Sequence, residues 1–193
     1  MRVLSIVHAD SDPPGLFEGV ASDLDHHHEE WRVDLAPEPP ARLDSFGAVG
    51  VFGGYMDPCD DDRLGWLRAE KDMLRSLVGR VPAIGICLGA QLLAEAAGGG
   101  IHPAEHPEIG WSDIEILPAA SSDPLFADLS DERTVFEWHS WTFDLPAGAV
   151  PLARSSGGLQ AYRLDPTTWG IQFHAEVTAD KLAEWLDHAA TDE

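Results

Sequence analysis

The chain has 193 residues, with 34 acidic against 12 basic side chains and a formal net charge of −22 at pH 7. This acidity excludes the basic face that nucleic-acid binding requires, and it opposes attachment to anionic lipid. The length allows a substantial core, so we expect residues 1–193 to form a single domain, with neither a membrane span nor a signal peptide.

The first part of the chain alternates between strand and helix patterns. Apolar runs predict strands at residues 2–9, 31–35 and 48–52, and a helix is expected at residues 13–25. Three consecutive histidines at residues 26–28 stand among acidic residues, and neighbouring positions of a helix do not share one face. We therefore expect this run on a solvated helix surface, and we predict no metal site and no cofactor.

An acidic loop and a long amphipathic segment come next. Residues 61–79 carry an apolar stripe at helical spacing and are expected to form a helix. Cys59 precedes this segment among several aspartates, which should raise its pKa, so we interpret it as a loop thiol. The only other cysteine is Cys87, and two thiols without a predicted disulfide indicate a reducing, cytoplasmic location.

The most informative motif is Gly85-Ile86-Cys87-Leu88-Gly89, which joins an apolar strand to an amphipathic helix. Gly-x-Cys-x-Gly at such a junction is the thiol form of a nucleophile elbow. Small flanking residues let the backbone turn tightly, and the free N–H groups of the helix start favour a thiolate. A buried structural cysteine is the alternative, but the paired glycines favour a nucleophile.

The second half of the chain is rich in strand patterns. Strands are expected, in chain order, at residues 112–117, 134–138, 150–155, 159–163 and 169–174, and a closing helix at 181–189. Alternating units followed by a group of strands predict an α/β three-layer sandwich with a central, mostly parallel but mixed sheet. The cysteine would then lie at the carboxyl end of a central parallel strand.

A candidate base lies in the last predicted strand. His174 and Glu176 are two residues apart, so on an extended backbone both side chains point to the same side. A carboxylate beside an imidazole fixes its tautomer and stabilises the imidazolium. An ordinary surface glutamate at a strand end is the alternative.

Taken together, these motifs resemble the class I, triad-type glutamine amidotransferases. The strings Gly85–Gln91 and Gln172–Glu176 are similar to the two signatures of that family, and Gly53-Gly54 resembles the glycine pair of its oxyanion loop. The segments 108–111 and 136–146 resemble the stand-alone, GMP-synthase-like members. The resemblance implies a flavodoxin-like fold and covers most of the chain.

The resemblance also implies roles for individual residues. Cys87 attacks the side-chain amide of glutamine, His174 transfers the proton, and Glu176 orients His174. The backbone N–H groups of Gly54 and Leu88 are the expected oxyanion donors.

A second set of residues is expected to bind the substrate. It consists of Gly53, Gln91, His139, Ser140 and Trp141. Two stretches depart from the family pattern: Tyr55-Met56-Asp57 stands where many relatives carry Pro and Ser, and Ser140-Trp141 stands where close relatives carry Gly-Asp. Trp141 either narrows the pocket or packs at its rim, which leaves the substrate open.

Three functions are consistent with these residues. The first is release of ammonia from glutamine to a separate synthetase subunit, because the chain carries no ATP-binding glycine-rich loop. The second is free-standing hydrolysis of γ-glutamyl amides or amines by the same three residues. The third is a non-catalytic regulatory subunit, which the intact Cys87, His174 and Glu176 argue against. A cysteine-elbow protease or chaperone fits the late His-x-Glu motif poorly.

Overall fold

The computed structural model describes residues 1–129 and 132–191. In this part of the chain the strands form one nine-stranded mixed sheet, in the order β2-β1-β3-β4-β9-β8-β7-β5-β6. The strands are β1 (Arg2–Val7), β2 (His27–Arg32), β3 (Ala48–Val51), β4 (Ala83–Ile86), β5 (Ile101–Ile116), β6 (Glu132–Phe143), β7 (Val150–Arg154), β8 (Leu159–Asp165) and β9 (Thr168–Ile171). The helices are α1 (Leu16–Asp23), α2 (Gly65–Leu77), α3 (Leu88–Ala96) and α4 (Ala179–Thr191).

One half of the sheet is parallel. The strands β2, β1, β3, β4 and β9 are neighbours in that order and all run the same way. This is the 2-1-3-4-5 order of flavodoxin-like sheets, in which ligands bind outside the carboxyl ends of the strands near the point where the order reverses. The α/β fold with a mixed sheet is therefore confirmed.

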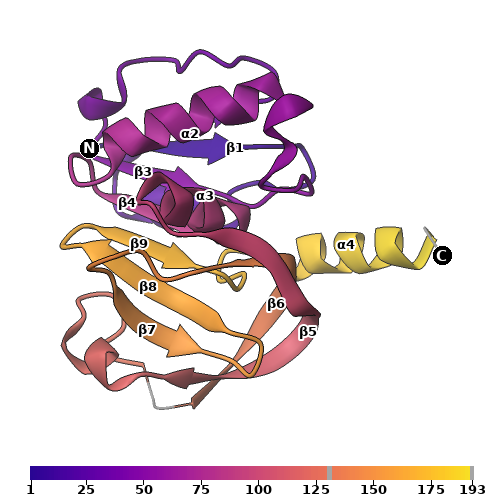
Figure 1. The fold of residues 1–193 in the computed structure, drawn as a ribbon. Coiled ribbons are helices and arrows are strands. Elements are labelled where there is room, and N and C mark those ends of the chain that lie inside the picture. The colour runs from indigo at the N-terminus through magenta and orange to yellow at the C-terminus, as the bar shows by residue number, and fades with distance from the viewer. Residues whose placement is uncertain (130–131, 192–193) are drawn as a thin grey trace.

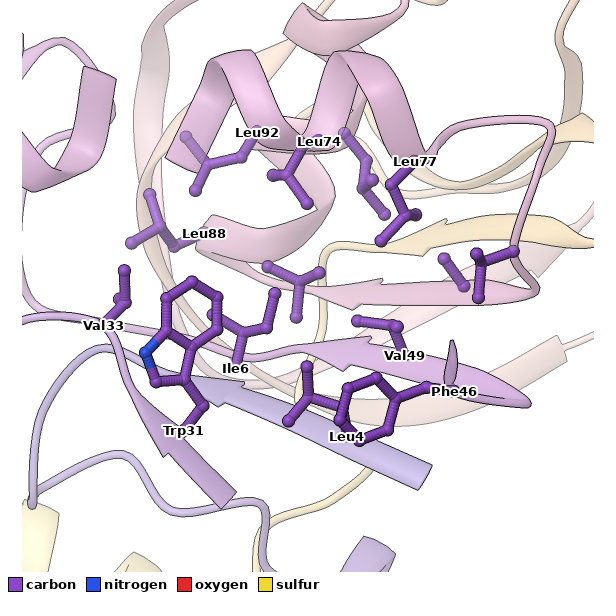
Figure 2. Packing of buried hydrophobic residues seen from close by; sticks show 14 of the residues in the cluster. Leu4, Ile6, Trp31, Val33, Phe46, Val49, Leu74, Leu77, Leu88 and Leu92 are labelled. Carbon is purple, nitrogen blue, oxygen red and sulfur yellow. The ribbon is translucent and has the colours of Figure 1, made fainter. Parts of the chain in front are cut away.

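The main core lies between this half of the sheet and two helices (Figure 2). Leu4 and Ile6 of β1 point towards α2 and α3, where they meet Leu74 and Leu88. Complete burial of one such side chain contributes about 1.5–3 kcal/mol. Val7, of opposite parity in β1, belongs to a cluster on the other face, against α1, so the parallel half has three layers.

The other half of the sheet is antiparallel, from β9 through β8, β7 and β5 to β6. Figure 1 shows these strands curling away from the parallel half, with the long β5 and β6 sweeping towards α4. A second core fills the curl and includes Ile114, Leu152 and Phe126. The result is a parallel half-sheet joined to a curled antiparallel half.

Several predicted elements have different bounds. The second strand is His27–Arg32 and not 31–35. Of the three histidines, His27 and His28 lie in this strand and His26 directly precedes it, so none lies on a helix. Here His27 and His28 pair with Arg2 and Val3 of β1. Pairing with a buried neighbour decides the conformation of this polar edge strand, whereas local hydrophobic periodicity does not reveal it.

The other differences concern length. The helix expected at 61–79 begins at Gly65, because Asp60–Asp62 form a separate 3-10 turn. The strands expected at 112–117 and 134–138 are parts of the much longer β5 and β6, which pair with each other through a register shift between Pro103 and Glu108. Prolines and charged residues interrupt the apolar alternation in the first part of β5, so hydrophobic periodicity does not predict a strand there.

Candidate active site

Cys87 stands at the strand-to-helix junction that the sequence predicts. It lies between β4 and α3 and is the N-cap residue of α3, with φ 52° and ψ −111°. A non-glycine residue in this region stores about 1–3 kcal/mol of strain, which the surrounding structure must hold. Part of that support is a hydrogen bond of 2.8 Å that the Cys87 N–H donates to the carbonyl of Ile171.

The glycines on either side of Cys87 are required by close backbone approach. A Cβ at Gly89 would lie 2.0 Å from the carbonyl oxygen of Val51, and a Cβ at Gly85 would lie 2.5 Å from the carbonyl oxygen of Gly89. Neither position has room for any side chain. The Gly-x-Cys-x-Gly pattern is therefore explained by packing of the turn against β3.

His174 and Glu176 meet as expected, although the local structure differs from the prediction. The His174 Nδ1 lies 2.8 Å from the Glu176 Oε1, and both side chains are buried. The strand ends at Ile171, so His174 follows the strand instead of lying within it. A turn after the strand brings the two groups together. This turn is stabilised by a hydrogen bond of 2.8 Å that the Leu16 N–H donates to the backbone carbonyl of Glu176.

The structure also brings Cys87 beside His174. Both face Gly53: a Cβ on that glycine would lie 3.4 Å from the His174 Cε1 and 3.8 Å from the Cys87 Cβ. Burial alone would lower the pKa of His174, but the interaction with the Cys87 sulfur and the hydrogen bond to Glu176 outweigh it and raise the pKa well above its ordinary value. The site thus favours an imidazolium next to the sulfur.

A helix from the end of the chain closes the other side of this imidazole. Trp185 of α4 packs edge-to-face on His174, with 5.1 Å between ring centroids. Its Nε1–H donates to the Ser11 carbonyl at 2.8 Å, which ties α4 to the loop after β1. Sequence patterns predicted α4 but not this contact, because nothing local pairs residue 185 with residue 174.

Gly54 and Leu88, which carry the two predicted oxyanion donors, belong to segments that contact each other. A Cβ on Gly54 would lie 3.0 Å from the Leu88 Cδ2, so the glycine loop after β3 packs directly on the first turn of α3. The first N–H groups of a helix have no acceptor within the helix. Leu88 is the first residue of α3, and its N–H belongs to this set.

A cavity of about 240 Å³ opens next to Cys87. We call it the Gln91 cavity, and four predicted substrate-binding residues line it together with Gly54 and Leu88: Gln91, His139, Ser140 and Trp141. Gly53, the fifth, is not among the lining residues. Its carbonyl lies 2.9 Å from the His8 Nδ1 and its Cα faces His174, so its contact with substrate stays a prediction.

Hydrogen bonds fix the orientation of several groups around the Gln91 cavity. The Gln91 Nε2 donates to the Trp141 carbonyl at 3.0 Å and to the Gln172 Oε1 at 3.2 Å, so the contact of its amide oxygen with a substrate stays a prediction. His139 supports the same carbonyl through Nδ1 at 3.0 Å, and its Nε2 lies 3.1 Å from Glu137.

The two stretches that depart from the family pattern contact each other. The Trp141 Nε1–H donates to the Asp57 Oδ1 at 2.7 Å, which ties the loop after β3 to β6 at the edge of the Gln91 cavity. Tyr55 is 78% exposed, whereas Met56 is buried in the main core, and both residues line the cavity. Trp141 thus forms one wall of the cavity.

A second buried histidine–glutamate pair was missed by sequence reasoning. The His8 Nε2 lies 3.0 Å from Glu70 and its Nδ1 lies 2.9 Å from the Gly53 carbonyl, and both side chains are fully buried. Both partners accept, so both ring nitrogens carry hydrogen. Burial by itself lowers the pKa of His8. The Glu70 carboxylate and the hydrogen bond to the Gly53 carbonyl raise the pKa by more than burial lowers it, so the net shift is upward. This pair holds the glycine loop in place.

Two local signals point to this pair. His8 directly follows the apolar run of β1, at the carboxyl end of that strand, and Glu70 occupies a position on the apolar stripe of α2 between Leu67 and Leu74. A charged residue at a buried helix position indicates a partner across the core. The partner itself cannot be identified from a separation of 62 residues.

We expect Glu70→Gln to destabilise the protein in a pH-dependent way. A group whose pKa is raised by folding stabilises the fold fully below its unfolded pKa, about 6.5 for histidine, and this stabilisation is lost as the pH rises through the folded pKa. The difference in unfolding free energy from wild type should therefore be about 1.5–3 kcal/mol at pH 6 and smaller at pH 9. Urea unfolding at both pH values measures it. The exposed Glu105→Gln is the matched control, and an equal difference at both pH values would contradict the expectation.

The remaining cysteine lines neither the Gln91 cavity nor the cavity on the His174 side of Cys87. Cys59 is exposed and unpaired, and its partial burial raises its pKa, with Glu95, Asp61 and Asp57 adding to the effect against Lys71. Within residues 1–129 and 132–191, no three His, Cys, Asp or Glu side chains are grouped so that they could hold a metal ion. No helix in the same ranges is long and apolar enough to cross a membrane.

Known proteins are similar to this chain in sequence. It is 30% identical to the glutamine amidotransferase-like protein YfeJ of Salmonella typhimurium, over 98% of this chain and 81% of that protein. It is 32% identical to a subunit of the glutamine-hydrolyzing GMP synthase of Natronomonas pharaonis, over 76% of this chain and 74% of that protein. It is 26% identical to the gamma-glutamyl-L-1-hydroxyisopropylamide hydrolase of a Pseudomonas species, over 86% of this chain and 61% of that protein.

The fold agrees with these relatives. A crystal structure of a glutamine amidotransferase from Thermotoga maritima superposes with a TM-score of 0.92 at 27% identity, covering 100% of this chain and 83% of that one. The family model "Glutamine amidotransferase class-I" matches residues 22–189. The chain therefore belongs to the class I glutamine amidotransferase family.

Proposed function

We propose that this protein hydrolyses a γ-glutamyl amide, either glutamine or an N-substituted form, through a thioester on Cys87. The observation that carries the proposal is the position of His174. Its imidazole lies between the thiol of Cys87, whose backbone is strained, and the Glu176 carboxylate, with 2.8 Å from Nδ1 to Oε1. A nucleophile, a proton carrier and an orienting group in this order are what acyl transfer requires.

In the first half of the proposed reaction, the Cys87 thiolate attacks the γ-carbonyl carbon. A C–S bond forms, and the negative charge moves to the carbonyl oxygen, facing the N–H groups of Gly54 and Leu88. Each such donor contributes about 3–4 kcal/mol to the transition state. The His174 imidazolium then gives its proton to the amide nitrogen, the C–N bond breaks, and ammonia or an amine leaves.

In the second half, water hydrolyses the thioester. Neutral His174 takes a proton from the water, the resulting hydroxide adds to the carbonyl carbon, and the C–S bond breaks. Glutamate leaves, and the thiolate–imidazolium pair is restored. Glu176 keeps the Nδ1–H of His174 directed towards itself throughout, so that Nε2 carries out both transfers.

The Gln91 cavity is proposed to hold the glutamyl part. The amide oxygen of Gln91 and the loop at 139–141 supply polar groups on the side of Cys87 away from His174. Trp141, held by Asp57, limits the length of what this cavity accepts.

The proposed fate of the nitrogen follows two of the relatives. The GMP synthase relative, itself one subunit of its enzyme, suggests that ammonia passes to a separate synthetase subunit. The Pseudomonas hydrolase suggests instead that the protein acts alone on an amide with a larger leaving group. We place the protein in the cytoplasm because the reaction requires a reduced Cys87, and both cysteines are free thiols.

A glutamine-like chloroketone tests the proposed nucleophile. Intact-protein and peptide mass spectrometry should locate one adduct on Cys87 and none on the exposed Cys59. An adduct on Cys59 alone would refute the assignment.

Steady-state assays with glutamine, before and after a partner synthetase is added, distinguish the two proposed fates of the nitrogen, since only an ammonia donor is stimulated by its acceptor.

A further inference from the structure

A second and larger cavity also reaches Cys87. We call it the Trp185 cavity; it has a volume of about 510 Å³ and shares Gly54, Tyr55, Cys87 and Trp138 with the Gln91 cavity. The two differ in one respect that matters for the reaction. His174 lines the Trp185 cavity, whereas it does not line the Gln91 cavity.

The position of His174 decides which part of a substrate each cavity holds. The group that leaves must receive its proton from the imidazolium, so it departs on the side of His174. The glutamyl part then occupies the Gln91 cavity, and the Trp185 cavity faces the leaving nitrogen. Ammonia alone would leave most of a 510 Å³ space empty, so this volume fits an amide whose nitrogen carries a substituent.

The walls of the Trp185 cavity are acidic. Asp10, Asp12 and Glu184 line it, and no lysine or arginine does among the residues described. Asp10 contacts Arg32 and Glu184 contacts Lys181, and neither of these two cations lines the cavity. Asp12 is therefore the carboxylate on which a cationic ligand in the cavity would depend most.

Asp12 lies near the reacting groups. Its Oδ1 is 3.9 Å from the position of a Cβ on Gly53, a point that also lies within 4 Å of His174 and Cys87. Its other oxygen accepts a hydrogen bond from the Ser11 hydroxyl. Burial raises the pKa of Asp12, and Ser11 and His174 lower it in part. A second positive charge in the cavity would further stabilise the ionised form.

Two tryptophans supply the other walls. Trp138 and Trp185 meet edge-to-face at 6.0 Å between centroids, and Trp185 is fixed by its hydrogen bond to Ser11. Aromatic faces pack well on an alkyl chain and attract an ammonium group, and a carboxylate adds direct charge pairing.

We propose that the Trp185 cavity is a binding site for the leaving amine, and that it selects γ-glutamyl amides whose amine part is an alkyl chain ending in a protonated amine. This inference rests on the proposed function. It specifies the substrate class through Asp12 and the two tryptophans, none of which belongs to the three residues that carry out the reaction.

The test compares matched substrates on the intact protein. γ-Glutamyl-1,4-diaminobutane carries a terminal ammonium, γ-glutamyl-n-pentylamide has a methyl group in its place, and γ-glutamyl-4-aminobutanoate carries a carboxylate. We expect kcat/KM for the diamine to exceed that for the pentylamide by about tenfold or more, and that for the aminobutanoate by a larger factor. A diamine that is no better than the pentylamide would overturn the inference.

Variants assign the preference to the cavity. Asp12→Asn should reduce the ratio of diamine to pentylamide by about tenfold, while Asp23→Asn, which removes an exposed charge of the same kind, should leave the ratio unchanged. The ratio is insensitive to a general loss of activity or folded protein, because both substrates meet the same variant. An unchanged ratio in Asp12→Asn would refute the role of Asp12.

The outcomes also separate this inference from the proposed function. Hydrolysis of glutamine or the pentylamide with labelling of Cys87, but without preference for the diamine, overturns only the amine site. Absence of hydrolysis for all four compounds, glutamine included, together with no chloroketone adduct on Cys87, overturns the proposed function itself.

Discussion

Cys87→Ala is expected to lower γ-glutamyl amide hydrolysis by about 10⁴-fold or more, because no other group can form the thioester. The side chain is only 6% exposed and packs with Val7, Phe52 and Ile86, so alanine leaves a small void and does not introduce a new polar group. The backbone keeps the same strained turn. Circular dichroism and thermal unfolding should therefore show a folded protein while steady-state assays show no turnover.

The exposed thiol provides the matched control. Cys59→Ala removes the other cysteine of the chain and should retain wild-type turnover. Cys87→Ser should behave as Cys87→Ala does, since a hydroxyl is a much weaker nucleophile at neutral pH. Turnover by folded Cys87→Ala above a few per cent of wild type would remove the proposed nucleophile.

His174→Ala should be nearly as damaging, with a loss of about 10⁴-fold, because the same imidazole serves both proton transfers. Glu176→Gln should cost about two orders of magnitude less, as the orienting member of such a triad is the least severe to lose. The pH profile of kcat/KM tests the role of Glu176 apart from that of His174. The reaction needs the His174 imidazolium, so kcat/KM should fall as the pH rises through the His174 pKa.

The direction of the Glu176→Gln shift follows from the geometry. Glu176 is one of the groups that raise the His174 pKa, so its neutral replacement should move the alkaline limb of the profile to lower pH. The exposed Glu105→Gln should leave that limb in place. A limb that does not move in Glu176→Gln would show that the carboxylate does not act on His174.

The parts of the site that could be predicted from sequence are those fixed by neighbours along the chain. The bend at Cys87 requires glycine on both sides, because the backbones of residues 51 and 89 come within contact distance. That steric need is visible in the printed sequence. The approach of His174 to Glu176 was also predictable, although the turn that produces it was not, since its hydrogen bonds come from α1 and β6.

The parts that could not be predicted depend on topology. His8 and Glu70 meet because β1 and α2 pack on one another, and Trp185 meets His174 because α4 returns to the loop after β1. The polar strand β2 forms because β1 offers it backbone hydrogen bonds. In each case the deciding partner is distant in sequence, and a single sequence carries no record of the pairing.

The contact between Trp185 and His174 has a consequence for protein synthesis. Ribosomes make the thiol of Cys87 well before the imidazole of His174, and the indole that packs on that imidazole comes later still. The parallel strand β9, whose Ile171 carbonyl accepts the hydrogen bond from the Cys87 N–H, is also made late, just before His174. We therefore expect the proposed hydrolysis to begin only after β9 and α4 have both left the ribosome and packed against the rest of the domain.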